Sequence, residues 1–131
     1  MHSKTLSKIL LIDNEQDILK LATIALKDIG QLKVKCCNSG KEAVQEVEAY
    51  DPDLILLDVI MPEMDGIHTL KAIRKLKTQK KTPIIFLTAL TEAGDIDYYR
   101  KLGALAVITK PFNPQTLAET LKTLWVQKHN E

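Results

Sequence analysis

Short, continuous apolar runs alternate along the chain with stretches whose apolar residues recur at helical spacing. Runs without polar interruption are typical of strands buried on both faces, whereas spacings of three and four residues are typical of amphipathic helices. The predicted strands cover residues 9–12, 32–37, 54–57, 83–87 and 105–108, and the helical faces cover 18–29, 43–47, 67–73, 91–102 and 117–125. This alternation predicts an α/β domain with a doubly wound parallel sheet of five strands and five helices.

Capping signals indicate where several of these helices begin and end. The predicted N-caps are Ser39, Asp65, Thr91 and Asn113, and the predicted C-caps are Gly30 and Gly103. Ser39 and Glu42 have the spacing of a capping box. Pro114 is expected at the first position of the last helix, where proline is favoured, and Phe112 and Leu117 are spaced as a hydrophobic staple.

Length and composition narrow the class of protein. The chain has 131 residues, 45% of them hydrophobic and 27% charged, with a net charge of +1. We expect one domain spanning residues 1–131 with a core at about 8–126. The balanced charge offers no global field for nucleic acid or a membrane surface, and no apolar run reaches the roughly 18–20 residues of a membrane span. With no signal-peptide core near Met1, the expected compartment is the cytoplasm.

One segment is strongly basic. It contains Lys71, Arg74, Lys75, Lys77, Lys80 and Lys81. The segment follows a predicted helix and precedes a predicted strand, so it should lie near the amino ends of the strands. We interpret it as a solvated helix face rather than a nucleic-acid interface.

Polar residues follow four of the five predicted strands. They are Asp13, Asn14 and Glu15 after the first strand, Asp58 after the third, Thr88 after the fourth and Lys110 after the fifth. Parallel sheets bind ligands outside the carboxyl ends of their strands. These side chains are therefore expected at one common edge.

The types of these residues suit phosphoryl transfer. Carboxylate and amide oxygens suit a hard cation such as Mg²⁺, and a carboxylate can act as a nucleophile that forms an aspartyl phosphate. A threonine hydroxyl and a lysine ammonium can then hold the phosphate. Taken singly, Asp13 or Asn14 can cap the first helix, and Thr88 or Lys110 can be structural or solvated. Asp58 has no helix to cap, and the convergence of all these groups favours a functional site.

Five stretches of the chain resemble the receiver domain of bacterial response regulators in two-component signalling. They are residues 9–15, 57–66, 86–89, 103–104 and 109–112. The most specific are Asp-x-x-Met-Pro-x-Met-Asp-Gly, which starts at Asp58, and Lys-Pro-Phe, which starts at Lys110. The resemblance runs from about residue 8 to residue 125. It implies a flavodoxin-like sheet with strand order 2-1-3-4-5.

The resemblance also implies roles for individual residues. Asp58 is expected to be the phosphoacceptor, Thr88 to hydrogen-bond a phosphoryl oxygen, and Lys110 to pair with the phosphoryl group. The metal, Mg²⁺ or alternatively Mn²⁺, is expected on Asp13, Asn14, Asp58 and the backbone carbonyl of Ile60. No other cofactor is implied. The bond between Lys110 and Pro111 is expected to be cis. Such a domain catalyses only its own phosphorylation and dephosphorylation, so it is not an enzyme in the usual sense.

Partners follow from the same resemblance. The phosphoryl donor is expected to be a histidine kinase or a histidine phosphotransfer protein. The output protein or effector domain is expected to bind the surface formed by residues 91–126, with Tyr98 and Tyr99 as candidate contacts. The resemblance allows a homodimer, and it implies neither nucleic-acid nor membrane binding by this domain.

Two residues depart from the family pattern. Asn14 replaces the second of two acids that usually follow the first strand, and the lost charge is expected to weaken metal binding by roughly one to two decades. Val107 stands where the family usually has Tyr or Phe, so an aromatic ring cannot report activation there. Because of these two departures, a second hypothesis stays open: the chain is a pseudo-receiver that binds a partner without being phosphorylated.

Two other sites fit the sequence poorly. A phosphatase of the haloacid dehalogenase type needs an acid two residues beyond its nucleophile, where this chain has Ile60. A flavodoxin-like flavin site needs a loop rich in Ser, Thr and Gly after the first strand. This chain has acidic residues there, and their charge repels a phosphate.

Overall fold

The computed structural model describes residues 5–89 and 93–130. It contains one five-stranded parallel sheet of order β2-β1-β3-β4-β5, which confirms the predicted topology. The strands are β1 (Lys8–Ile12), β2 (Lys33–Cys37), β3 (Leu54–Asp58), β4 (Ile84–Thr88) and β5 (Ala106–Thr109). The helices are α1 (Gln16–Thr23), η1 (Ile24–Ile29), α2 (Gly40–Tyr50), α3 (Gly66–Arg74), η2 (Lys77–Gln79), α4 (Ala93–Lys101) and α5 (Leu117–His129). No helix in the described ranges has the length and apolarity needed to cross a membrane.

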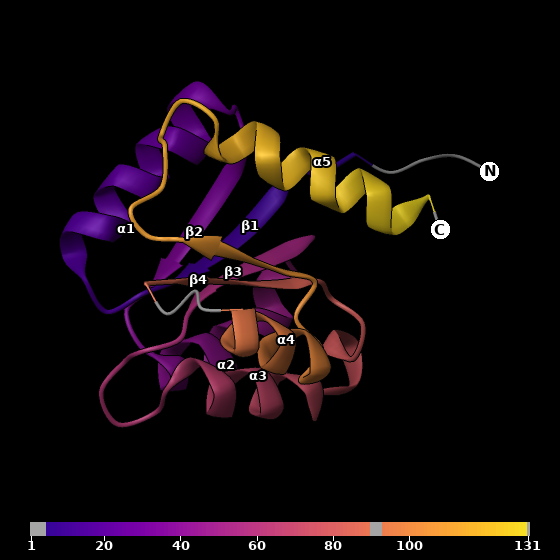
Figure 1. The fold of residues 1–131 in the computed structure, drawn as a ribbon. Helices are drawn as coiled ribbons and strands as arrows, with labels where there is room; N and C mark the ends of the chain where they lie inside the picture. The colour runs from indigo at the N-terminus through magenta and orange to yellow at the C-terminus, as the bar shows by residue number, and fades with distance from the viewer. Residues whose placement is uncertain (1–4, 90–92, 131) are drawn as a thin grey trace.

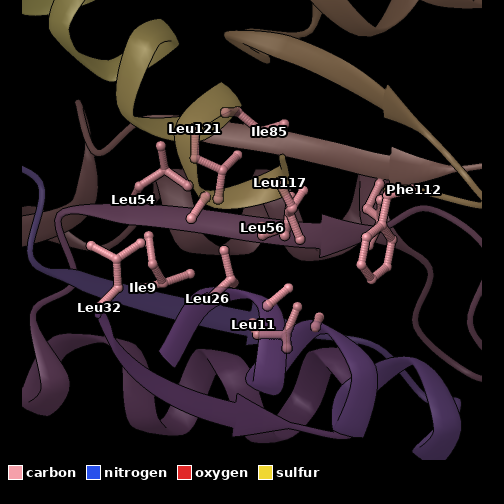
Figure 2. Packing of buried hydrophobic residues seen from close by; sticks show 14 of the residues in the cluster. Ile9, Leu11, Leu26, Leu32, Leu54, Leu56, Ile85, Phe112, Leu117 and Leu121 are labelled. Carbon is pink, nitrogen blue, oxygen red and sulfur yellow. The ribbon is translucent and has the colours of Figure 1, made fainter. Parts of the chain in front are cut away.

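The sheet is covered on both faces. Helices α1 and α5 lie on one face, and α2, α3 and α4 lie on the other (Figure 1). In β1, Ile9 and Leu11 belong to the core on the α1 and α5 side, whereas Leu10 and Ile12 belong to the core on the opposite side. Figure 2 shows part of the first of these cores, in which residues of β1, β3 and β4 pack against α5 and η1. Every position of β3 and β4 is buried, as expected for central strands of a doubly covered sheet.

Several predicted caps are confirmed. The Ser39 hydroxyl accepts a hydrogen bond from the Glu42 backbone N–H at 3.1 Å, and the Glu42 carboxylate accepts one from the Asn38 N–H at 2.7 Å. Asp65 caps α3 by accepting a hydrogen bond from the His68 N–H at 2.8 Å. Gly103 follows α4 with a φ of 109°, a conformation that favours glycine. The predicted cap Thr91 lies outside the described residues.

The end of the first helical segment differs from the prediction. Residues Ile24–Ile29 form a π-helical segment, in which the Gly30 N–H donates to the Ala25 carbonyl five residues earlier. The wider turn rotates Ile29 outward, and this residue is 42% exposed although helical spacing predicted it to be buried. Gly30 does follow the segment, but its φ is −85°. What its position requires is space, because an added Cβ would lie 2.3 Å from the Cβ of Ala118.

The last helix begins later than predicted. Asn113 was expected to cap it and Pro114 to start it, but α5 begins at Leu117. The Asn113 side chain instead accepts a hydrogen bond from the Gln115 N–H at 2.9 Å, and its carbonyl accepts from the N–H groups of Thr116 and Leu117. The asparagine therefore stabilises a turn that leads into the helix.

Candidate functional site

The carboxyl ends of the strands carry the residues singled out in the sequence. Asp13 directly follows β1, Asp58 and Thr88 are the last residues of β3 and β4, and Lys110 directly follows β5. Because all strands are parallel, these ends meet at one edge of the sheet (Figure 1). Asp13, Asp58 and Thr88 are at most 3% exposed. The site is therefore built on rigid strand ends.

Lys110 joins three carboxylates. Its Nζ lies 2.8 Å from Asp13 Oδ2, 3.3 Å from Asp58 Oδ1 and 3.2 Å from Glu15 Oε1. The Lys110 backbone N–H donates to the Thr88 carbonyl at 2.9 Å, which extends the pairing of β5 with β4 by one residue. The Lys110–Pro111 peptide bond is cis, as the resemblance implied.

Both the backbone and the side chain of Asp13 form hydrogen bonds. Its N–H donates to the Cys37 carbonyl at 3.1 Å, and its Oδ1 accepts a hydrogen bond from the Glu15 N–H at 2.9 Å. The second oxygen, Oδ2, is buried, and its partner among the described residues is the ammonium of Lys110 at 2.8 Å. A carboxylate oxygen can accept more than one partner, so Oδ2 can also bind a further ligand.

The surroundings of Asp58 favour its protonated form. Burial and the negative charge of Asp13 raise the pKa of the Asp58 carboxyl from an ordinary 3.8 to about 6. Lys110 and a hydrogen bond from the Ile60 backbone N–H oppose this rise only in part. Burial lowers the pKa of the Lys110 ammonium, but its bond to Asp13 and the charges of Asp13 and Asp58 outweigh burial and raise that pKa.

The loop after β3 folds closely over Asp58. The Gly66 N–H donates to the Val59 carbonyl at 2.7 Å, and Glu63 adopts a φ of 66° in the turn between them. A Cβ on Gly66 would lie 2.3 Å from the Asp58 carbonyl oxygen. Only glycine therefore fits at the start of α3, a requirement that the sequence analysis did not identify.

The donor set fits a hard divalent cation. Asp13, Glu15 and Asp58 each offer a carboxylate oxygen, and these three oxygens lie within 4.8 Å of one another. Among the described residues, three carboxylates face one ammonium, that of Lys110, so the site carries excess negative charge that a cation would balance. Glu15 was not among the predicted ligands, although the spacing Asp13-x-Glu15 was visible in the sequence. Asn14 is exposed and makes no hydrogen bond within the described residues.

The residues expected to transmit activation are distributed between the core and the surface. Val107 is half-buried and packs against the core that contains Phe86 and Tyr99. The rings of Phe86 and Tyr99 make an edge contact with centroids 5.1 Å apart, and Tyr99 is 4% exposed. Tyr98 is 49% exposed. Of the two tyrosines considered for a partner surface, only Tyr98 offers its ring to solvent.

Comparison with known proteins agrees with this arrangement. The family profile described as the response regulator receiver domain matches residues 9–122. The alkaline phosphatase synthesis transcriptional regulatory protein PhoP of Bacillus subtilis is 38% identical over 117 residues, which cover 89% of this chain and 48% of that protein. A CpxR homolog of Haemophilus influenzae, described as a transcriptional regulatory protein, is 38% identical over 120 residues, which cover 91% of this chain and 50% of that protein. The chain thus spans about half the length of these two relatives.

A solved structure shows the same fold. The chemotaxis response regulator CheY4 of Vibrio cholerae superimposes with a TM-score of 0.84 at 33% sequence identity, over 92% of this chain and 99% of that chain. The profile match, the two regulators and this superposition cover nearly the same residues and agree with the strand-end site described above. The chain therefore belongs to the response regulator receiver domain family.

Proposed function

We propose that Asp58 accepts a phosphoryl group. In the proposed step a carboxylate oxygen of Asp58 forms a bond to phosphorus, the bond from phosphorus to the donor nitrogen of a phosphohistidine breaks, and its electron pair returns to the imidazole. The observation that carries the proposal is a buried carboxylate, 3% exposed at the end of β3, with the ammonium of Lys110 at 3.3 Å. The product is an acyl phosphate on the side chain.

Lys110 and Thr88 are proposed to hold the phosphoryl group. The ammonium that now lies between Asp13 and Asp58 is within reach of oxygens carried by Asp58, and its charge would stabilise them. The Thr88 hydroxyl, at the end of the neighbouring strand, would donate a hydrogen bond to another phosphoryl oxygen. Phosphate adds about −1.5 to −2 charges, which is enough to change the preferred arrangement of the adjoining loops.

We propose Mg²⁺, with Mn²⁺ as an alternative, as the cation of this site. The ligands would come from Asp13, Asp58, the Asn14 amide oxygen and the Ile60 carbonyl, and the position of Glu15 adds a further carboxylate. When bound, the cation supplies positive charge that lowers the repulsion between the carboxylates and the incoming phosphoryl oxygens. The oxygen-only donor set is the reason for choosing a hard cation.

The partners are also part of the proposal. The donor would be a histidine kinase or a histidine phosphotransfer protein. The output protein or effector domain would bind the 91–126 surface, of which residues 91 and 92 lie outside the described ranges, with exposed Tyr98 as a contact. Four other expectations stay predictions. They are a cytoplasmic compartment, a homodimer as an alternative to the monomer, a single domain with a core at 8–126, and no binding of nucleic acid or membranes by this domain.

The chain is a receiver domain and not an enzyme of the usual kind. Its proposed chemistry is limited to its own phosphorylation and dephosphorylation. The alternative, a pseudo-receiver that binds a partner without phosphorylation, rested on Asn14 and Val107. The assembled lysine and carboxylates favour the phosphorylated receiver, because a module that only bound partners would gain nothing from burying Asp13 and Asp58 beside each other.

Intact mass spectrometry tests the proposal. The protein is treated with acetyl phosphate and Mg²⁺, and the mass of one added phosphoryl group is expected. Asp58→Asn is expected to show no gain. Asp51→Asn is the matched control, because Asp51 is an exposed aspartate with a φ of 51° that asparagine tolerates. It should be phosphorylated like the wild type.

Two results would contradict the proposal. One is an unchanged mass in folded wild-type protein with both donor and metal present. The other is a phosphoryl group that still appears on Asp58→Asn, since it would then reside on another side chain. The first result, together with normal partner binding, would favour the pseudo-receiver.

A further inference from the structure

A hollow of about 750 Å³ lies at the edge of the sheet opposite Asp58. Pro83, which directly precedes β4, and Leu105, which directly precedes β5, both line it, so it opens at the amino ends of these strands. Five of its nine lining residues are basic: Arg74, Lys80, Lys81, Arg100 and Lys128. The hollow thus brings together part of the basic segment noted in the sequence and two basic residues from distant helices.

No carboxylate of the described residues pairs with the positive charges of this hollow. None of the nine lining residues is acidic. Within residues 5–89 and 93–130, none of the five basic side chains forms an ion pair. Arg74 instead donates to the neutral Gln79 carbonyl at 3.0 Å, which orients its guanidinium group. Burial lowers the pKa of this group, but arginine stays charged at neutral pH.

Helix ends explain only part of this charge. Arg74 is the last residue of α3, and Arg100 and Lys128 lie in the last turns of α4 and α5. Each helix C-terminus carries about half a negative charge, so three of them compensate roughly 1.5 of the five positive charges. Lys80 and Lys81 precede β4 outside these helices. A substantial positive surplus therefore faces the hollow.

We propose that this hollow binds a small anion with several phosphates, such as a nucleoside polyphosphate. Two guanidinium groups suit bidentate contacts with phosphate oxygens, and the ammonium groups beside them suit the further charges of a phosphate chain. The volume lies within the roughly 300–1,000 Å³ of small-molecule sites. A concave site encloses a compact ligand, whereas a nucleic-acid duplex would contact an extended row of basic residues.

A titration followed by two-dimensional ¹H–¹⁵N NMR tests this proposal. Inorganic tripolyphosphate and ATP are added in separate arms at low salt without divalent metal. Both are expected to shift the amides of residues 80–81 and 100–105. If ATP and tripolyphosphate bind with equal affinity, the site recognises the phosphate chain alone. If ATP binds more tightly, the nucleoside also contacts the site. Either result supports the site.

Paired variants separate the hollow from general surface charge. Arg100→Gln combined with Lys128→Gln is expected to weaken tripolyphosphate binding at least about tenfold, because charge-assisted hydrogen bonds are lost. The matched control, Lys71→Gln combined with Lys75→Gln, removes the same charge outside the hollow and should retain most of the affinity. Thermal melting of both pairs checks that each remains folded.

Four results would overturn the proposal. In the titrations, these are the absence of amide shifts at millimolar ligand, or shifts confined to the surroundings of Asp58 and Lys110. In the variants, it is an equal weakening of tripolyphosphate binding in both pairs. The fourth is a DNA duplex that shifts the same amides and binds the protein more tightly than ATP does. The duplex result would instead indicate a nucleic-acid surface.

Discussion

The substitution Asp58→Asn should stabilise the metal-free protein at neutral pH. Asp58 is 3% exposed, and burial together with the charge of Asp13 raises its pKa to about 6. An acid whose pKa is higher in the folded protein than in the unfolded chain makes the folded state less stable once pH exceeds both values. Asparagine keeps nearly the same shape without the charge.

The expected gain follows from the two pKa values. A carboxyl pKa of about 6 in the folded protein against an ordinary 3.8 corresponds to about 3 kcal/mol of destabilisation at pH well above 6. The pKa of about 6 already includes the opposing effect of the ion pair with Lys110 at 3.3 Å, so the loss of that pair on substitution is not subtracted again. We expect a gain of about 1–3 kcal/mol at about pH 7.5. At about pH 4, where Asp58 is protonated when folded and about half protonated when unfolded, most of the gain should disappear.

Urea unfolding with a chelator present measures this effect. Trp125 is 1% exposed, so its fluorescence should report unfolding. Asp51→Asn serves as the control at an exposed aspartate and should change stability little at either pH. Adding Mg²⁺ at about pH 7.5 should stabilise the wild type and have a smaller effect on Asp58→Asn, because a ligand that binds the folded state raises its stability.

Two outcomes would refute this reasoning. If Asp58→Asn lowers stability at about pH 7.5, the ion pair with Lys110 outweighs the repulsion from Asp13 and the cost of burial. If the gain is equal at the two pH values, the effect does not arise from titration of Asp58. Either result would mean that the charge balance inferred for the site is wrong.

Three further substitutions test neighbouring features. Gly66→Ala should destabilise the fold by about 3 kcal/mol in urea unfolding, because its Cβ would lie 2.3 Å from the Asp58 carbonyl oxygen; a neutral effect would contradict the close packing of this loop. Ser39→Ala should cost about 1 kcal/mol by the same assay, since the Glu42 N–H loses its hydrogen bond, and an unchanged midpoint would mean that water replaces the cap. Asn14→Asp should raise Mg²⁺ affinity by roughly one to two decades in a calorimetric titration, and equal affinities would show that the missing charge is compensated.

The topology was predictable because the central strands carry a local signal. All five residues of β3 and of β4 are buried, and the first four of each strand are apolar without interruption, unlike the alternating faces of an amphipathic helix. Strand-to-helix alternation then restricts the connections to right-handed crossovers. The residue at each strand end follows directly, which is why Asp58 and Lys110 were found without coordinates.

Features that depend on tertiary contact were not predictable in the same way. The π-helical segment that exposes Ile29 leaves the apolar spacing unchanged, so a helical pattern could not distinguish it from a regular helix. Gly30 looked like an ordinary C-cap, whereas its position is set by the approach of Ala118 from α5. The start of α5 was misplaced because Asn113 can stabilise either a helix start or a turn, and the turn is formed.

The contact between Lys110 and Glu15 joins residues 95 positions apart, and no local pattern encodes it. It arises because β1 and β5 end at the same edge, and Lys110 bridges the gap between them. The contact links stability to function. Lys110 is the only basic residue paired with these three carboxylates in the described ranges, so it limits their repulsion in the metal-free protein. The same ammonium is proposed to bind phosphoryl oxygens carried by Asp58. Removing the charge of Asp58 should therefore stabilise the metal-free protein and abolish phosphorylation, whereas removing the charge of Lys110 should weaken both.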